Sequence, residues 1–359
     1  MMKFRLPVVS LPERRSAPGT HFVLLACGVI VAGLCLIQPL RVHAQTPPKP
    51  RPQSHAVQPA DNLVELLSQM QSAARDLDYS GVYVHNHNGA MVSSRIVHVI
   101  DGTGERERLQ ILDGPAREYI HHNNTIQCLV PDKQKVFIEK ERTDRFPGLL
   151  LSDPDRIPAN YEARMNVARQ RVAGRECSVT DLQARDANRY HYRICTDVHT
   201  NLLLKVETLN PERKIVEQIV FTMVDIDKDV PHELLAPSWD TKEWQVVEAV
   251  MEPVDLARQG WRIPYPPGFE PAMQVTRTMR NDRQVSQMVL TDGLAAVSVF
   301  IEPVRGASGD AFESSQLEAG AVNIFRTRIG DHWMTVLGEV PAPTLRSIAE
   351  RTEFVPLAR

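Results

Sequence analysis

The sequence predicts an α+β protein that consists mostly of antiparallel β-strands. One amphipathic helix is expected over residues 62–77, where apolar residues recur at helical spacing. A run of short strands, separated by turn residues, follows from residue 79 to about residue 139. Consecutive short strands with tight turns are typical of an antiparallel meander and not of a parallel α/β sheet.

Turn residues place two of the predicted hairpins. Asn88-Gly89 lies between two strand-like segments, and Asp292-Gly293 joins two more near the C-terminus. Many strands alternate charged with apolar residues, which predicts a sheet with one covered face and one wet face. Near the end of the chain, Thr344 is expected to cap a final helix.

Residues 1–44 have the pattern of an export signal peptide. A basic start precedes an apolar run over residues 22–37, and small residues up to Ala44 resemble a cleavage site before Gln45. The apolar run is shorter than the roughly 20 residues that a membrane span needs. An uncleaved anchor and lipid attachment at Cys27 are the two alternatives. The signal favours export to the periplasm.

The mature chain divides by composition. Residues 45–59 are rich in Pro, Gln and basic residues, which predicts a disordered leader. What remains is long enough for two domains. We expect an N-terminal domain over residues 60–230, a proline-containing linker over residues 231–243, and a smaller β-rich C-terminal domain over residues 244–359.

Composition and motifs argue against several classes of protein. The net charge of -3, with no stripe of Lys or Arg, makes nucleic acid an unexpected partner. The sequence has no nucleophile elbow, zinc-protease motif or phosphate-binding loop. His85 and His87 are among the best metal candidates, but a zinc site usually needs three or four convergent ligands. We therefore expect a binding protein without a cofactor, a metal or catalytic residues.

Three cysteines remain once the signal peptide, with Cys27 and Cys35, is removed. In an oxidising compartment Cys128, Cys177 and Cys195 allow three single pairings. The last two lie near the far ends of two predicted strands, so an antiparallel hairpin favours a disulfide between them. Cys128 lies in an apolar strand and is expected to be a buried free thiol.

The expected binding site is a groove. A helix on a strongly curved antiparallel sheet leaves a concave, apolar surface that suits acyl chains or an amphipathic peptide. The proline-interrupted apolar segment at residues 145–162 is expected to be a loop, part of which would act as a lid. For Tyr190 and Tyr192, ordinary core packing is the alternative to lining this groove. The predicted ligand-binding residues are Phe146, Leu149, Leu150, Leu151, Tyr190 and Tyr192.

Several segments resemble the RseB/MucB family. They are YSGVYV at residues 79–84, SRIVH at 94–98, ERL at 107–109, LDG at 112–114, RE at 117–118, FP at 146–147, and DGLAAVSVF at 292–300. The likeness covers residues 60 to 355 in order and spacing. It implies an N-terminal domain like the lipoprotein carriers LolA and LolB, an unclosed β barrel with helices, followed by a smaller β-rich C-terminal domain.

The resemblance also implies a function. Members of this family are periplasmic negative regulators of the sigma-E (AlgU) envelope-stress pathway. The resemblance implies binding to the periplasmic region of a single-pass anti-sigma factor (RseA/MucA-like), which shields that partner from the site-1 protease. Lipopolysaccharide or another lipid amphiphile would release it. We expect acyl chains in the N-terminal groove and the peptide at the face between the domains.

Two other functions remain as alternatives. A periplasmic lipid or lipoprotein carrier would use the LolA-like fold for transport, but a simple carrier has no need of a second domain. A periplasmic enzyme is the other alternative, and it would need an active site that none of the known catalytic motifs considered above reveals. The sequence leaves open whether the chain forms a homodimer.

Overall fold

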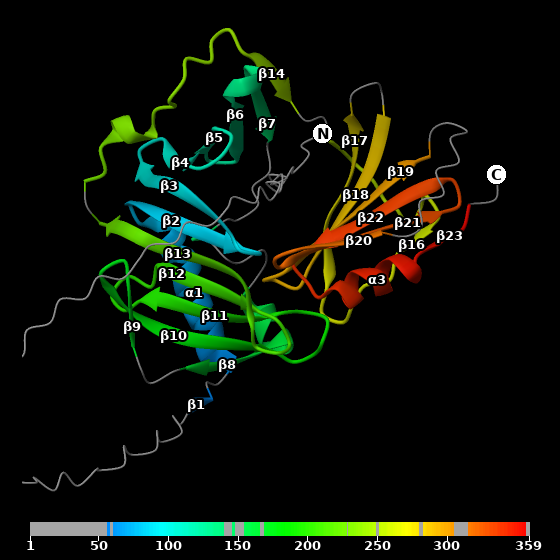
Figure 1. Ribbon diagram of the computed structural model, residues 1–359, viewed down its shortest axis with the longest axis horizontal. Helices are drawn as coiled ribbons and strands as arrows, with labels where there is room; N and C mark the ends of the chain where they lie inside the picture. Colours follow the sequence, from blue (N-terminus) through cyan, green and yellow to red (C-terminus); the bar gives the residue numbers. More distant parts are fainter. Residues whose placement is uncertain are drawn as a thin grey trace, which may run out of the picture. The chain divides into compact units, whose positions relative to one another are not determined.

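The computed structural model describes residues 56–57, 60–139, 146–147, 154–165, 169–227, 229–248, 251–279, 283–304 and 315–356. Within these ranges the strands form a fourteen-stranded sheet, a seven-stranded sheet and a two-stranded sheet. The path of the first sheet runs from β1 (Ala56–Val57) to β14 (Gln245–Glu248), so its described strands form an open sheet. The predicted α+β fold of mostly antiparallel strands is confirmed (Figure 1).

The predicted amphipathic helix is α1 (Ala60–Asp76). Leu63, Leu67 and Met70 recur along its inner stripe, and each is at most 2% exposed. The helix lies against one face of the first sheet (Figure 1) and shares its hydrophobic core. Burial of this stripe, more than helix propensity, holds such a helix in place.

The first half of this sheet is a meander in chain order. Asn88 and Gly89 both have positive φ angles, as the predicted hairpin between the first two strands requires. A short 3₁₀ turn, η1 (Pro131–Lys133), precedes the last strand. The strands are β2 (Tyr79–His87), β3 (Ala90–Asp101), β4 (Gly104–Ile111), β5 (Arg117–His122), β6 (Thr125–Val130) and β7 (Lys135–Glu139).

The second half of the sheet joins the first through the pairing of β13 with β2. The short helices η2 (Pro154–Arg156) and α2 (Ile157–Asn160) precede it. Its strands are β8 (Tyr161–Met165), β9 (Gln170–Val172), β10 (Arg175–Ala184), β11 (His191–Asp197), β12 (Leu203–Leu209) and β13 (Ile215–Ile226).

Three segments differ from the sequence-based expectation. Residues 157–162, expected as loop, form α2 and the start of β8, because Ile157 and Tyr161 are buried in the first core. Ala56–Val57, expected in the disordered leader, pairs with β8. β14, expected at the start of the C-terminal domain, pairs in parallel with β7, so it belongs to the first sheet.

The second sheet follows a short 3₁₀ turn, η3 (His232–Leu235), and β14. Beside it, β16 (Trp261–Arg262) pairs with β23 (Glu353–Phe354). The strands of the second sheet are β15 (Met251–Pro253), β17 (Glu270–Met279), β18 (Arg283–Thr291), β19 (Ala296–Pro303), β20 (Ser315–Ala319), β21 (Val322–Ile329) and β22 (His332–Gly338).

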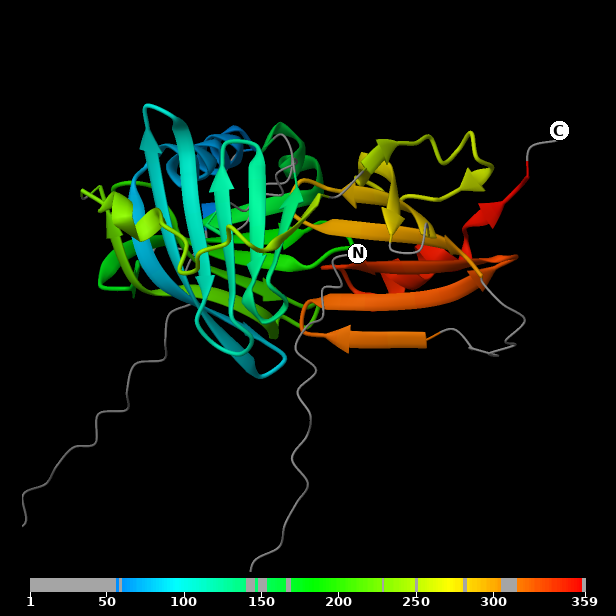
Figure 2. The same ribbon diagram turned by 90° about the horizontal axis from the view of Figure 1, so that it is seen from above.

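One helix, α3 (Ala342–Glu350), packs on β21 and β22 (Figure 2). Leu345 and Ile348 are buried in its interface with the sheet. The predicted cap was wrong. The helix begins after Pro341 without a side-chain cap, and the Thr344 hydroxyl instead donates a hydrogen bond to the Asn188 carbonyl oxygen in the loop between β10 and β11.

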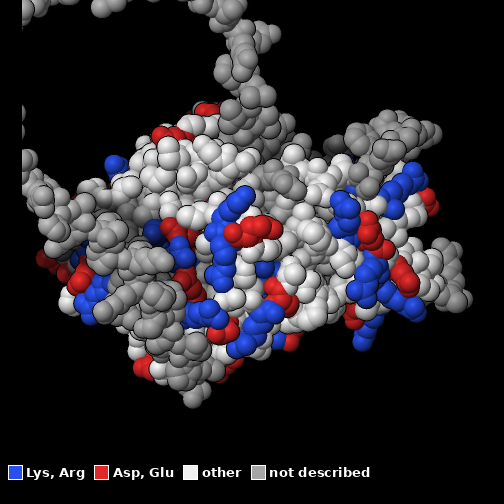
Figure 3. Space-filling model, turned by 60° about the horizontal axis from the view of Figure 1, so that its bottom comes forward, with Lys and Arg blue, Asp and Glu red and all other residues white. Residues whose placement is uncertain are grey.

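No helix in the described ranges has both the length and the apolar character that a membrane crossing requires. On the face shown in Figure 3, basic and acidic side chains of the described residues lie next to one another. Such mixed charge is typical of a solvated protein surface.

Candidate functional site between the two sheets

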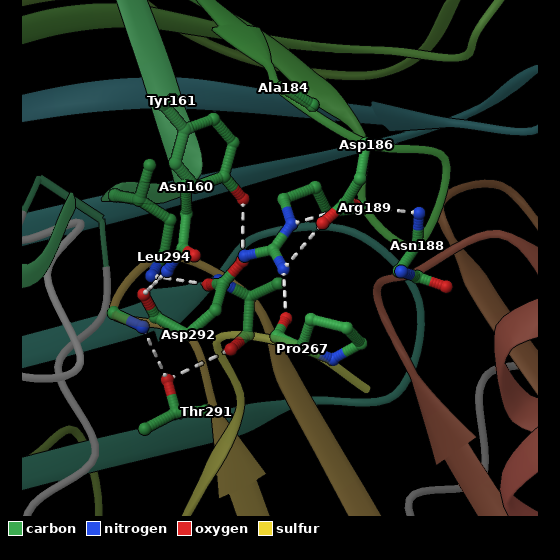
Figure 4. A network of polar contacts seen from close by, with 12 residues as sticks. Asn160, Tyr161, Ala184, Asp186, Asn188, Arg189, Pro267, Thr291, Asp292 and Leu294 are labelled. Carbon is green, nitrogen blue, oxygen red and sulfur yellow. Dashed lines mark hydrogen bonds and ion pairs between the residues drawn. The ribbon is translucent and has the colours of Figure 1, made fainter. Parts of the chain in front are cut away.

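We call the part of the chain that carries the first sheet the first domain and the part that carries the second sheet the second domain. The turn between β18 and β19 carries the central residue of a polar network that joins the two. Asp292 Oδ1 accepts hydrogen bonds from the backbone N–H groups of Leu294 (2.9 Å) and Ala295 (2.7 Å). Gly293 supplies the positive φ of 105° that the turn needs. The turn therefore satisfies Oδ1 of the carboxylate, and Oδ2 accepts hydrogen bonds from the first domain (Figure 4).

Arg189, in the loop between β10 and β11, meets this second oxygen. Its Nη1 donates to Asp292 Oδ2 at 2.7 Å, and the Tyr161 hydroxyl donates to the same oxygen at 2.8 Å. The Arg189 and Asp292 side chains are both 0% exposed. An ion pair removed from water in this way is stable only if further hydrogen bonds satisfy both partners.

The remaining donors of Arg189 are also used. Its Nε and Nη2 donate to the Asp186 carboxylate at 3.1 Å each, and Nη2 also donates to the Pro267 carbonyl oxygen. Its guanidinium carbon lies 5.0 Å from the Phe269 ring centroid. Burial alone would lower the pKa of Arg189, but the bonds to Asp186 and the charge of Asp292 raise it. The guanidinium therefore stays charged inside the interface.

Apolar packing reinforces the same contact. Leu294 is 3% exposed and belongs to the core cluster of the first domain, although it comes from the second. Asn160 Nδ2 donates to the Asp292 carbonyl oxygen at 3.2 Å. A Cβ atom on Gly268, which has a φ of +78°, would lie 2.1 Å from Asn160 Oδ1. Any other residue there would have to displace the Asn160 side chain and adopt a backbone conformation that favours glycine.

A second contact lies at the end of β21. Asn323 is buried, and its Nδ2 donates to the Tyr190 hydroxyl at 3.0 Å and to the Val340 carbonyl oxygen at 2.8 Å. Nearby, a Cβ atom on Gly320 would lie 3.0 Å from the Cβ atom of His87. The β20–β21 turn therefore rests on the β2–β3 hairpin of the first sheet.

The predicted ligand-binding residues do not form an open groove where the structure describes them. Phe146 is 9% exposed and packs against Tyr83 and Phe221, with ring centroids 5.0 Å away from each. Tyr190 and Tyr192 are 5% and 2% exposed. The Tyr190 hydroxyl is at the interface with Asn323, as described above. Leu149, Leu150 and Leu151 lie outside the described residues, so their role as a lid stays a prediction.

Two recesses in the described surface are poor matches for an acyl chain. A cavity of about 80 Å³ at the domain contact is lined by Asn188, Thr344 and a run of prolines, and it is far smaller than a typical ligand pocket. A recess of about 390 Å³ beside β9 and β10 is lined by polar residues, among them Arg169, Arg171 and Glu176. Neither is an apolar groove.

The structure joins Cys177 and Cys195 by a disulfide, the pair that the sequence favours. Their Cα atoms lie 5.5 Å apart on the antiparallel neighbours β10 and β11. Cys128 is buried and is not part of this disulfide. Among the described residues, no group of three or more His, Cys, Asp and Glu side chains could hold a metal ion.

Sequence reasoning missed the residues that hold the domains together. The sequence pattern places Asp292 in a hairpin turn without indicating a partner, and Arg189 and Asn323 have no periodic or motif signal. Each acts through a partner more than 100 residues away in the chain, at 103 residues for Arg189–Asp292 and 133 for Asn323–Tyr190. The one available signal was the resemblance itself, since residues 292–300 are among the segments that carry it.

Known families match both domains. The family model of the MucB/RseB N-terminal domain matches residues 62–239, and that of the MucB/RseB C-terminal domain matches residues 255–353. The sigma factor AlgU regulatory protein MucB of Pseudomonas aeruginosa is 30% identical over 299 residues, which cover 82% of this chain and 91% of that protein. The sigma-E factor regulatory protein RseB of Escherichia coli is 25% identical, with 80% and 90% covered.

Solved structures agree with these matches. The complex of Pseudomonas aeruginosa MucA and MucB contains a chain that is 27% identical to this one, with a TM-score of 0.65, and the match covers 83% of this chain and 100% of that chain. Another structure, MucB in complex with MucA(peri), gives 28% identity and a TM-score of 0.64 with the same coverage. Because both domain models match in order and relatives align over most of their length, the chain belongs to the MucB/RseB family.

Proposed function

We propose that this chain binds the periplasmic region of a transmembrane anti-sigma factor of the RseA/MucA type. Bound there, it shields the partner from site-1 proteolysis and so represses a sigma-E-type envelope-stress response. The observation that carries the proposal is the match of both domains to MucB, which has been solved in complex with MucA(peri). The proposal places the protein in the periplasm, as a regulatory binding protein and not an enzyme.

The interface between the domains supports a binder that uses both. The buried Arg189–Asp292 pair, the inserted Leu294 and the Asn323–Tyr190 bond hold the second sheet against the first. A surface made from two fixed domains presents its contacts with little reorganisation, which lowers the entropic cost of binding. A transport groove finds less support, because packed aromatic and aliphatic side chains fill the described inner face of the first sheet.

Release by lipopolysaccharide or another lipid amphiphile completes the proposal. If peptide and amphiphile prefer different states of the protein, each lowers the affinity of the other by the same factor. Leu149, Leu150 and Leu151 are the proposed lid. Replacing all three with serine should weaken lipid-sensitive release and leave peptide binding unchanged. Unaltered release would rule out the lid.

The first test is capture of the partner. The exported protein, immobilised, is incubated with detergent-solubilised native inner membrane, and bound material is identified by mass spectrometry, with heat-denatured protein as the control. Enrichment of a single-pass protein with a cytoplasmic sigma-binding domain is the expected result. Recovery of lipids or lipoproteins without such a protein would contradict the proposal and favour a carrier.

Lipopolysaccharide is then added to the captured complex. The proposal expects the anti-sigma factor to elute at lipopolysaccharide concentrations that leave an unrelated immobilised complex intact. A purified site-1 protease gives the second readout, because the captured partner should be cut slowly in the complex and rapidly after release. Equal cleavage with and without the protein would contradict the shielding role.

A further inference from the structure

The two larger sheets end in four terminal strands, and β20 is the longest of them. It has 5 residues, whereas β1, β15 and β14 have 2, 3 and 4. Figure 2 shows β20 at the margin of the second sheet. Among the described residues no strand pairs with its outer side, so this edge presents backbone N–H and C=O groups that another strand can bond.

β20 lacks the features by which most proteins protect an exposed edge. Proline, lysine and β-bulges are common among them. The strand contains neither proline nor lysine, and its register with β21 is unbroken from Ser315 to Ala319. By contrast β15, the terminal strand at the opposite margin of this sheet, ends in Pro253. The edge of β20 is therefore the one better suited to pairing.

One face of this edge is apolar. Leu317 is 60% exposed and lies opposite Ile324 on β21, which in turn lies opposite Leu337 on β22. All three are on the face away from α3, because the alternate residue Phe325 belongs to the core that α3 covers. The row ends at an exposed leucine, so a further strand with an apolar residue opposite Leu317 would remove that side chain from water.

The other face of the edge carries an arginine from α3. Arg346 Nη2 donates to Gln316 Oε1 at 2.7 Å, and its guanidinium carbon lies 5.7 Å from the Phe325 ring centroid. Arg346 is exposed, and it makes no ion pair with any residue that the structure describes. These contacts hold a cation at the edge strand, where a carboxylate opposite Gln316 would meet it.

The sequence of β20 itself supplies both groups that would complete this edge. When a second copy of β20 runs antiparallel to the first and is centred on Leu317, the two leucines lie opposite each other. Gln316 then lies opposite Glu318 of the second copy, one residue to either side of the centre. That carboxylate reaches the face that carries Arg346. Residues 316–318, Gln-Leu-Glu, are thus complementary to themselves.

The position of the first domain agrees with such pairing. The turn after β20 rests on the first domain of its own chain, where a Cβ atom on Gly320 would lie 3.0 Å from the Cβ atom of His87. Antiparallel strands place these turns, and with them the two first domains, at opposite ends of the joined edge. A contact that uses the same surface on both copies is isologous, the type found in twofold dimers.

We propose that β20 is a self-association edge, through which two copies of this chain join their second sheets by antiparallel pairing centred on Leu317. Backbone hydrogen bonds hold the strands together, the paired leucines extend the apolar row, and Arg346 of each copy binds Glu318 of the other. Five residues on each side make a small contact, so the dimer is weak and forms at high protein concentration. This inference does not depend on the proposed function.

Cysteine cross-linking tests the register. In Leu317→Cys the two Cα atoms at the twofold axis would lie about 5 Å apart, a separation that a disulfide spans. Mild oxidation of the full chain at high concentration should therefore give a covalent dimer on a non-reducing gel. Ser315→Cys is the matched control, because the two cysteines would be roughly 14 Å apart. Equal cross-linking of the two variants, or none in Leu317→Cys, would overturn the pairing.

Sedimentation equilibrium measures the association itself. Leu317→Ser should weaken the wild-type dimer about tenfold and Arg346→Gln about threefold. Both residues are exposed, so the variants should fold. Val246→Ser removes an exposed side chain from β14, another terminal strand, and should leave the dimer unchanged.

A wild-type chain that stays monomeric at every concentration, or a dimer insensitive to Leu317→Ser, would overturn the proposal. A monomeric wild type whose capture of an anti-sigma factor is weakened by Leu317→Ser would also overturn it, and would assign the edge to that partner instead. Failure of membrane capture contradicts the proposed function and leaves the cross-linking result to decide the dimer.

Discussion

Arg189 and Asp292 form a fully buried ion pair across 103 residues of sequence, with 2.7 Å between Nη1 and Oδ2. The pair joins the two domains. Asp292 Oδ1 also accepts from the Leu294 and Ala295 N–H groups, Oδ2 also accepts from the Tyr161 hydroxyl, and Arg189 Nε and Nη2 donate to Asp186. A buried pair of this kind adds little net stability compared with apolar residues. What it does supply is a single geometry for the contact.

Removing one partner should therefore cost far more than the pair contributes. Asp292→Ala leaves the Arg189 charge buried without its partner, and we expect a loss of about 3 kcal/mol in the free energy of unfolding. Urea denaturation measures it. Asp331→Ala breaks an exposed pair with Arg328 at 3.8 Å and should cost less than about 0.5 kcal/mol. Similar losses in the two variants would contradict a structural role for Asp292.

Tyr190 and Tyr192 provide a matched comparison, since the two are buried and two residues apart. Tyr190→Phe removes the acceptor for Asn323 and should cost about 1 kcal/mol. Tyr192→Phe removes a hydroxyl with no partner among the described residues, so its free energy of unfolding should be unchanged or higher. Thermal and urea unfolding of both variants test this. A larger loss for Tyr192→Phe would show that its hydroxyl is bonded.

These residues also show how far the sequence predicts the structure. The α1 stripe and the hairpin at Asn88-Gly89 were predictable, because local periodicity and turn chemistry determine them. β8 could not be predicted, because the prolines before it made residues 145–162 resemble a loop. The contacts of Arg189 and Asp292 could not be predicted either, since neither residue lies in a local pattern that would reveal a distant partner. The candidate site depends on such contacts, so its residues could not be predicted from the sequence.

The disulfide should stabilise the first domain. Cys177 and Cys195 are 18 residues apart in sequence, and closing a loop of that size contributes roughly 3 kcal/mol in the chain-entropy model. The double variant Cys177→Ala/Cys195→Ala should lose about that amount. Dithiothreitol should lower the melting temperature of the wild-type chain and leave that of the double variant unchanged. Equal sensitivity of the two proteins to the reductant would contradict the bond.

Asp197 should make the free energy of unfolding decrease at acid pH. Burial alone would raise its pKa, but the Arg175 guanidinium and the N–H groups of His199 and Thr200 lower it below the ordinary 3.8. The carboxylate's contribution is therefore present above pH 3.8 and is lost as pH falls through the lowered value. Asp197→Asn should cost about 2 kcal/mol at pH 7, with the difference from wild type shrinking in acid. A constant difference would contradict the mechanism.

Glu339 should have the opposite effect, so that its contribution to stability is lost as pH rises. Its pKa of about 7 exceeds the ordinary 4.5, so between these pH values the folded protein binds more protons than the unfolded chain. Stability from this group is thus fully present below pH 4.5 and is lost as pH rises through about 7. Glu339→Gln removes the titration, so this variant should gain stability relative to wild type as pH increases from 4.5 to 7. Melting temperatures of both proteins across this window measure the change, with Glu248→Gln as the exposed control. A difference that stays flat with pH would contradict the raised pKa of Glu339, which loss of solvation and the charge of Glu217 cause.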